Sequence, residues 1–212
     1  DYESAHRHGL ELLNILSPDG TLNDTVPDPY RGLSTKEARK RVVEDIKEAG
    51  LFIREEEHNH QIGHCYRCDT VVEPYLSDQW FVRMKPLADK AYKAWQDGKI
   101  KFFPRRWENT YTNWLENIRD WCISRQIWWC HRIPVWYDDE SGEMIVSRED
   151  PTDLPEHQGK KLRQDEDVLD TWFSSWLWPF STLGWPQETE DLATFFPTTA
   201  LVTAYDIIFF WV

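Results

Sequence analysis

The spacing of apolar side chains predicts three helices in the first two thirds of the chain. The first runs from Ser34 to Gly50, with apolar residues at helical intervals, an S-T-K-E capping box formed by Ser34 and Glu37, and a glycine stop. A second helix covers about 86–97. A third covers about 105–121, where aromatic residues fall on one stripe.

Short apolar runs between these helices predict extended segments. The runs expected to form strands or strand-like segments are 51–54, 71–84, 99–103, 127–137 and 197–204. After residue 205 the chain is expected to turn into a helix. The polar and acidic segment 138–164 is expected to be irregular, as an insertion or an exposed linker.

The overall composition favours a folded protein. Hydrophobic residues make up 41% of the 212 residues and charged residues 29%, which supports a packed core and excludes a wholly disordered chain. No apolar run approaches the roughly 20 residues of a membrane helix, so we expect no membrane partner.

The net charge of −13 argues against a non-specific nucleic-acid binder. The charge is uneven, however: residues 1–57 carry −5, residues 58–137 carry +4 and residues 138–212 carry −12. A basic middle segment can present a local nucleic-acid surface, but charge alone favours the interpretation as ordinary solvated charge.

Two of the four cysteines are spaced for metal binding. Cys65 and Cys68 form a C-x-x-C pair that can hold one Zn²⁺ from a tight turn, but a structural site needs four ligands. The pair therefore belongs to a zinc site completed by nearby histidines or by other sequence, or it binds nothing, or it is a redox pair. So few cysteines predict a reducing compartment, the cytoplasm.

Another candidate site lies near the end of the chain. Ile207 and Trp211 are four residues apart and share a face if that stretch is helical. A strand ending before Asp206 would put this carboxylate at the carboxyl edge of a sheet, where ligands of open α/β folds bind. Together with Trp172 these residues form a candidate pocket, and plain core packing is the competing interpretation. Asp1 alone indicates no chemistry.

At the level of longer motifs, the chain resembles the valyl-tRNA synthetases, a class I aminoacyl-tRNA synthetase family of bacterial type. The resemblance is carried by WCISRQIWWCHRIPVWY (121–137), DEDVLDTWFSSWLWPFSTLGWP (165–186) and PTTALVTAYDIIFFWV (197–212), which are similar to its catalytic-domain motifs. Residues 58–84 resemble the return segment after the editing insertion, and residues 1–24 resemble the end of the editing domain.

The resemblance implies an α/β fold, part of a Rossmann-like class I catalytic domain joined to a connecting module and to the tail of a β-rich editing domain. We expect the editing part at 1–57, the connecting segment at 58–104 and the second half of the catalytic domain at 105–212. The HIGH and KMSKS signatures are absent from the sequence, and both ends look cut. We therefore expect an internal fragment that is inactive without the remaining parts of the same polypeptide.

For the full-length enzyme, the resemblance implies ATP-dependent activation of valine with Mg²⁺, transfer to tRNA(Val) and hydrolysis of mischarged threonine. Trp172, Ile207 and Trp211 would line the valine pocket. A small apolar slot excludes larger side chains but rejects a hydroxyl isostere poorly, valine against threonine being the established case, which is why editing is needed. The alternatives are an isoleucine-type synthetase and a non-catalytic zinc- or RNA-binding module.

The resemblance also assigns roles to single residues. Asp206 would meet the ribose of the adenylate, and Ala204 stands where the family has glycine, as does Cys130. Asp1 falls on the aspartate that holds the amino group in the editing site. Cys65 and Cys68 match half of a four-cysteine zinc site, so zinc is a possible cofactor beside ATP.

Overall fold

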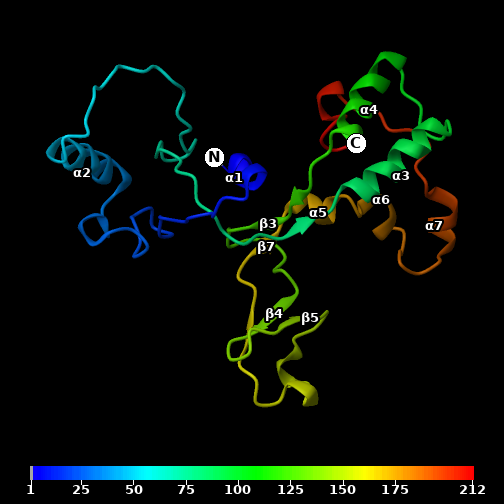
Figure 1. Cartoon of the computed structure of the whole chain (residues 1–212). Helices are drawn as coiled ribbons and strands as arrows, with labels where there is room; N and C mark the ends of the chain where they lie inside the picture. The colour runs from blue at the N-terminus through cyan, green and yellow to red at the C-terminus, as the bar shows by residue number, and fades with distance from the viewer. Residues whose placement is uncertain (1) are drawn as a thin grey trace. The chain divides into compact units, whose positions relative to one another are not determined.

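A computed structural model describes residues 2–212. The chain divides into two compact units, one ending at Asp78 and the other spanning Gln79–Val212 (Figure 1). The sequence analysis expected domain boundaries after residues 57 and 104, whereas the compact units meet after residue 78. The expected domain boundaries come from the family resemblance and stay predictions. No helix within residues 2–212 combines the length and the apolar character needed to cross a membrane.

The first unit is built around helix α2 (Thr35–Glu48). The capping box is confirmed, because the Ser34 side chain accepts from the Glu37 N–H and the Glu37 carboxylate accepts from the Ser34 N–H. Ala38 packs with Leu16 and Leu22 in a small core. The unit also contains helix α1 (Tyr2–His8) and the 3₁₀ turn η1 (Asp28–Tyr30).

The expected strand at 51–54 does not form, because this segment pairs with no strand or bridge and Ile53 is 90% exposed. A strand is stable only when another strand pairs with it. Within residues 2–57 the backbone pairs across single bridges, Leu16 with Leu22 and Thr21 with Ser34, so the placement of this part at the end of a β-rich editing domain stays a prediction.

The second unit has a helical core. It joins helix α3 (Lys85–Gln96) to the 3₁₀ turn η2 (Arg105–Trp107) and helix α4 (Glu108–Glu116), which confirms the second predicted helix and shortens the third. Its buried residues are Ala88, Tyr111, Leu115 and Ile208. The expected strand at 99–103 is wrong, because Ile100 and Phe102 pack against this helical core instead of pairing with a strand.

Seven short strands complete the second unit. They are β1 (Phe81–Val82) with β2 (Trp121–Cys122), β3 (Ser124–Arg125) with β7 (Val168–Leu169), and β4 (Val135–Asp138) between β5 (Met144–Val146) and β6 (Leu162–Gln164). Every pair in the described chain is antiparallel. A parallel sheet requires crossover connections and further strands. The expected α/β character is therefore confirmed only as a mixture of helices and strands.

The acidic segment 138–164 is more ordered than the sequence predicted. It supplies β5, β6 and the 3₁₀ turns η3 (Pro151–Asp153) and η4 (Pro155–His157), and it encloses the buried Pro151. The expected strand at 127–137 shrinks to β4, which forms the middle of this small sheet. Each outer strand has three residues, which is too short to show a periodic pattern in the sequence.

The last part of the chain contains α5 (Thr171–Ser175), α6 (Trp178–Ser181), α7 (Glu190–Phe195) and the 3₁₀ turn η5 (Tyr205–Ile207). The buried strand expected at 197–204 is wrong: these residues are exposed, Val202 by 96%, and pair with no other strand. The expected helix after residue 205 is reduced to this turn and its continuation to Trp211.

One carboxylate joins several of these segments. Asp165 Oδ2 accepts from the indole Nε1 of Trp80 and from the Tyr137 hydroxyl, both at 2.8 Å, and Asp165 Oδ1 accepts from the Asp167 N–H at 2.9 Å. Burial by itself raises the pKa of Asp165, but these hydrogen bonds outweigh it, and the pKa lies below its usual value. The charged carboxylate thus ties β4 and β6 to the start of the unit.

We predict that Asp165→Asn lowers the free energy of unfolding by about 1–2 kcal/mol at neutral pH, the usual loss for bonds to a charged group. Since the folded pKa is depressed, this contribution is present above the unfolded pKa and is lost as the pH falls below about 4. Urea unfolding at several pH values measures it. Glu166→Gln is the control at the neighbouring residue. The prediction is contradicted if the difference in unfolding free energy between Asp165→Asn and the parent does not shrink in acid.

Candidate functional site

Two of the three residues expected to line a pocket are in direct contact. The indoles of Trp172 and Trp211 stack with ring centroids 3.6 Å apart and planes at 16°. Trp172 lies in the first turn of α5, and Trp211 lies near the end of the chain. Their exposed fractions are 37% and 36%, so the pair forms a partly open aromatic surface. At this separation the rings touch, and no side chain fits between them.

The segment that carries Trp211 is held by the helical core. Ile208 is buried among residues of α3 and α4, and the Tyr205 ring stacks on Trp107 at 4.9 Å with planes at 7°. The Trp211 N–H donates to the Ile207 carbonyl at 2.9 Å, so these two residues are one helical turn apart, as the sequence spacing indicated. The core thus fixes where the second indole lies.

The position of Trp172 is set by the start of α5. The Asp170 side chain caps this helix by accepting the Trp172 N–H at Oδ1 over 2.9 Å. The other carboxylate oxygen forms an ion pair with Arg125. Sequence reasoning missed both residues, although a D-x-W pattern just after a strand is a recognisable helix start.

The residues expected at the nucleotide lie on the surface, in the segment of the chain that leads to Trp211. Ala204 and Asp206 are exposed, and Ala204 is extended with φ −69° and ψ 150°, a conformation open to any residue. Cys130, at the other position where the family has glycine, adopts φ 158°, at the margin of the region that favours glycine. The two glycine replacements are therefore not equivalent: the backbone at position 204 suits a residue with a side chain better than the backbone at position 130 does.

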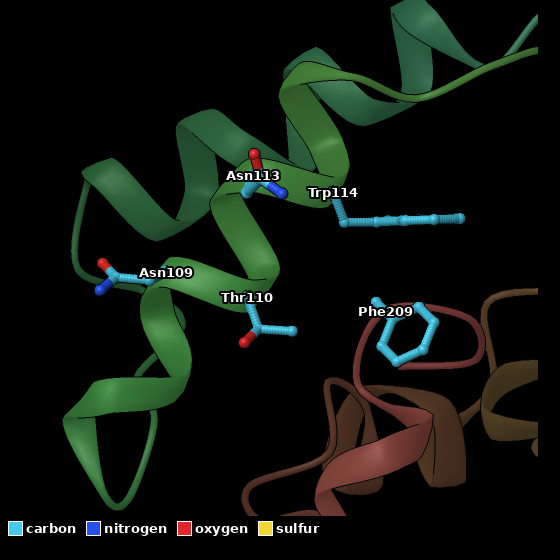
Figure 2. A pocket seen from close by; sticks show the side chains of 5 residues that line it. All are labelled: Asn109, Thr110, Asn113, Trp114 and Phe209. Atoms are coloured by element: carbon cyan, nitrogen blue, oxygen red, sulfur yellow. The ribbon is translucent and has the colours of Figure 1, made fainter.

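A shallow cavity of about 540 Å³ lies on α4 and is lined by Asn109, Thr110, Asn113, Trp114 and Phe209. Figure 2 shows the Trp114 ring above Phe209, with Thr110 and Asn113 on the helix beside them. None of the residues expected to bind valine or nucleotide lines this cavity. Sequence reasoning placed Trp114 on a core stripe and missed its exposed side.

The C-x-x-C pair lies in a tight turn of the first unit. The backbone closes this turn by hydrogen bonds from the Cys65 N–H to the Thr70 carbonyl and from the Asp69 N–H to the Cys65 carbonyl, both 2.8 Å. Hydrogen bonds from Thr70 and from Cys65 lower the pKa of the Cys68 thiol to about 7. Within residues 2–212 no group of three or more metal-ligating side chains comes together, so the nearby histidines do not complete a site. The aspartate expected to act in editing, Asp1, lies outside the described residues.

Comparison with known proteins identifies the family. Residues 31–212 match the pattern of the tRNA synthetases class I (I, L, M and V), and the chain belongs to this family. It is 66% identical over all 212 residues to the valine–tRNA ligase of Treponema denticola, 59% to that of Treponema pallidum and 55% to that of Thermotoga maritima. It covers 23%, 22% and 24% of these proteins, so it spans less than a quarter of their length.

We predict that the stacked tryptophans stabilise each other. A double-mutant cycle of Trp172→Ala and Trp211→Ala should give a coupling of about 1 kcal/mol beyond the separate losses, since paired aromatic rings contribute that much above area burial. Chemical unfolding of the four proteins measures it. Trp172→Ala with Trp178→Ala is the control cycle, which should be additive, and additivity of the first cycle would mean that the stack contributes nothing.

Proposed function

We propose that this chain is a segment of a valine–tRNA ligase, whose complete polypeptide activates valine with ATP and transfers it to tRNA(Val). The support is the match of all 212 residues of this chain to proteins that bear this name, at 55–66% identity. The family pattern covers isoleucine, leucine, methionine and valine enzymes, so it leaves the amino acid open. The relatives' names favour valine over the isoleucine alternative.

In this proposal the tryptophan pair is one composite wall of the valine slot. Because the two indoles touch, the isopropyl group of valine packs against their exposed surface and not between them. Ile207, one turn before Trp211, limits the depth of the slot. Two flat rings and a β-branched side chain leave room for an isopropyl group and exclude longer side chains, whereas threonine fits. Hydrolytic editing in the same enzyme then removes mischarged threonine.

The nucleotide side of the proposed site lies at Ala204 and Asp206. The exposed Asp206 carboxylate is available to accept hydrogen bonds from ribose hydroxyls, and Ala204 is extended just before it. ATP with Mg²⁺ would supply the adenylyl group that the valine carboxylate accepts in the complete enzyme, with pyrophosphate as the leaving group. In this chain, Asp206 binds the sugar and the tryptophan wall orients the amino acid, which brings the carboxylate of valine toward the nucleotide.

The remaining assignments follow the same proposal. Residues 105–212 form the second half of a Rossmann-like domain once the rest of the polypeptide supplies parallel neighbours, residues 58–104 connect, and residues 1–57 end the editing domain with Asp1 at its site. The partners are valine, ATP, tRNA(Val) and the remaining parts of the same polypeptide. The enzyme works in the cytoplasm, where aminoacyl-tRNA is used.

The test is ATP–pyrophosphate exchange with valine, isoleucine and threonine, using the full-length polypeptide that carries this segment. Ile207→Ala should raise kcat/KM for isoleucine relative to valine by about tenfold or more, since the one methylene by which isoleucine exceeds valine is worth that much in a slot that excludes it. Val202→Ala is the exposed control. The 212-residue chain alone should give no exchange. Equal use of valine and isoleucine by the unaltered enzyme, or exchange by the chain alone, contradicts the proposal.

We also propose that Cys65 and Cys68 supply half of a zinc site whose other ligands lie elsewhere in the polypeptide. The tight turn and the lowered pKa of Cys68 suit thiolate ligands. Metal analysis of the full-length protein should find one zinc per chain, lost in Cys68→Ser and retained in Cys122→Ser. Stoichiometric zinc in the 212-residue chain alone would instead support the non-catalytic zinc-binding module.

A further inference from the structure

Arg125 is held in one orientation by three acceptors. Its Nη1 donates to the carbonyl oxygens of Cys122 at 3.0 Å and of Ser124 at 2.8 Å, and its Nη2 pairs with Asp170 Oδ2. The guanidinium thus bonds backbone of its own strand region on one side and a carboxylate on the other. A rigid, planar fork of donors fits this arrangement, whereas the single ammonium of a lysine does not.

Asp170 is held just as closely. It follows β7, which pairs with β3 so that Arg125 lies opposite Val168. Its N–H donates to the Ile123 carbonyl at 2.7 Å, and its side chain is only 11% exposed. One carboxylate oxygen faces Arg125 and the other accepts the Trp172 N–H. The carboxylate is therefore a bridge between a fixed guanidinium and the first turn of α5.

We propose that Arg125 is a positioning residue for the amino-acid slot: acting through Asp170, it sets where the Trp172 indole lies against Trp211. The consequence for substrate rests on the proposed function, whereas the placement of the indole does not. The Asp170 carboxylate accepts the Trp172 N–H. Rotation of the Asp170 side chain therefore shifts or breaks the hydrogen bond that holds the backbone carrying this indole.

Capping alone does not require the arginine. Elsewhere in the chain α2 begins with a Ser34 cap and α7 with a Thr189 cap, and neither hydroxyl is paired with a cation in the described structure. A capping aspartate has a second oxygen that lets its side chain rotate between equivalent states. Arg125 occupies that oxygen and leaves one rotamer, which orients the helix start in addition to stabilising it.

The first test uses circular dichroism of the 212-residue chain. Closely stacked indoles give a couplet, two bands of opposite sign, in the far-ultraviolet circular dichroism spectrum. The part of the couplet that disappears in both Trp172→Phe and Trp211→Phe comes from this pair, because Trp121 and Trp176 remain in both variants. Arg125→Gln should reduce this part toward the level of Trp211→Phe. Asp170→Ser keeps a capping oxygen but loses the ion pair, and it should match Arg125→Gln.

The matched control is Arg132→Gln. Arg132 donates to backbone carbonyls of Gln164 and Asp165 beside the same strands but does not touch Asp170. It should lower stability and leave the couplet intact, while Arg125→Lys should recover part of the couplet. An unchanged couplet in Arg125→Gln, or an equal loss in Arg132→Gln, overturns the positioning role.

The second test uses the full-length polypeptide. Arg125→Gln should raise KM for valine about tenfold, the equivalent of one charge-assisted hydrogen bond, with a smaller change in kcat and in KM for ATP. If the couplet falls while KM for valine is unchanged, the positioning of Trp172 stands and the valine slot of the proposed function fails. If kcat, both KM values and the couplet are all unchanged, the inference itself fails.

Discussion

The contact between Trp172 and Trp211 brings together two segments that no regular secondary structure joins directly. One indole stands on a short helix that follows an antiparallel strand pair, and the other stands on a turn anchored in the helical core through Ile208. The helix that carries Trp172 has five residues and little stability without its cap. The geometry of the site therefore depends on strand pairing and helix packing at once.

The sequence grouped these residues as a candidate pocket but did not predict how they pack. Spacing placed Ile207 and Trp211 on one face, the candidate pocket also included Trp172, and the structure brings Trp172 into contact with Trp211. The stacking of the two rings depends on tertiary packing, and tertiary packing leaves no signal in the sequence. Asp170 and Arg125 were missed because their ion pair joins residues 45 positions apart, although Asp170 has the local pattern of a helix start.

The fold was predictable where its causes are local. The capping box at Ser34 and the helix ending before Gly98 are written in adjacent residues, and both helices form as expected. Strands depend on partners far along the chain. Residues 197–204 have strand composition but no neighbour to pair with, whereas two three-residue stretches of the largely polar segment 138–164 pair with β4.

The central claim is that the exposed surface of the tryptophan pair contacts the side chain of valine. A crystal structure of the full-length polypeptide with a non-hydrolysable valyl-adenylate analogue tests it most directly. The account predicts the isopropyl group in van der Waals contact with both Trp172 and Trp211, and the ribose beside Asp206. An analogue bound with its isopropyl group away from either indole would contradict it.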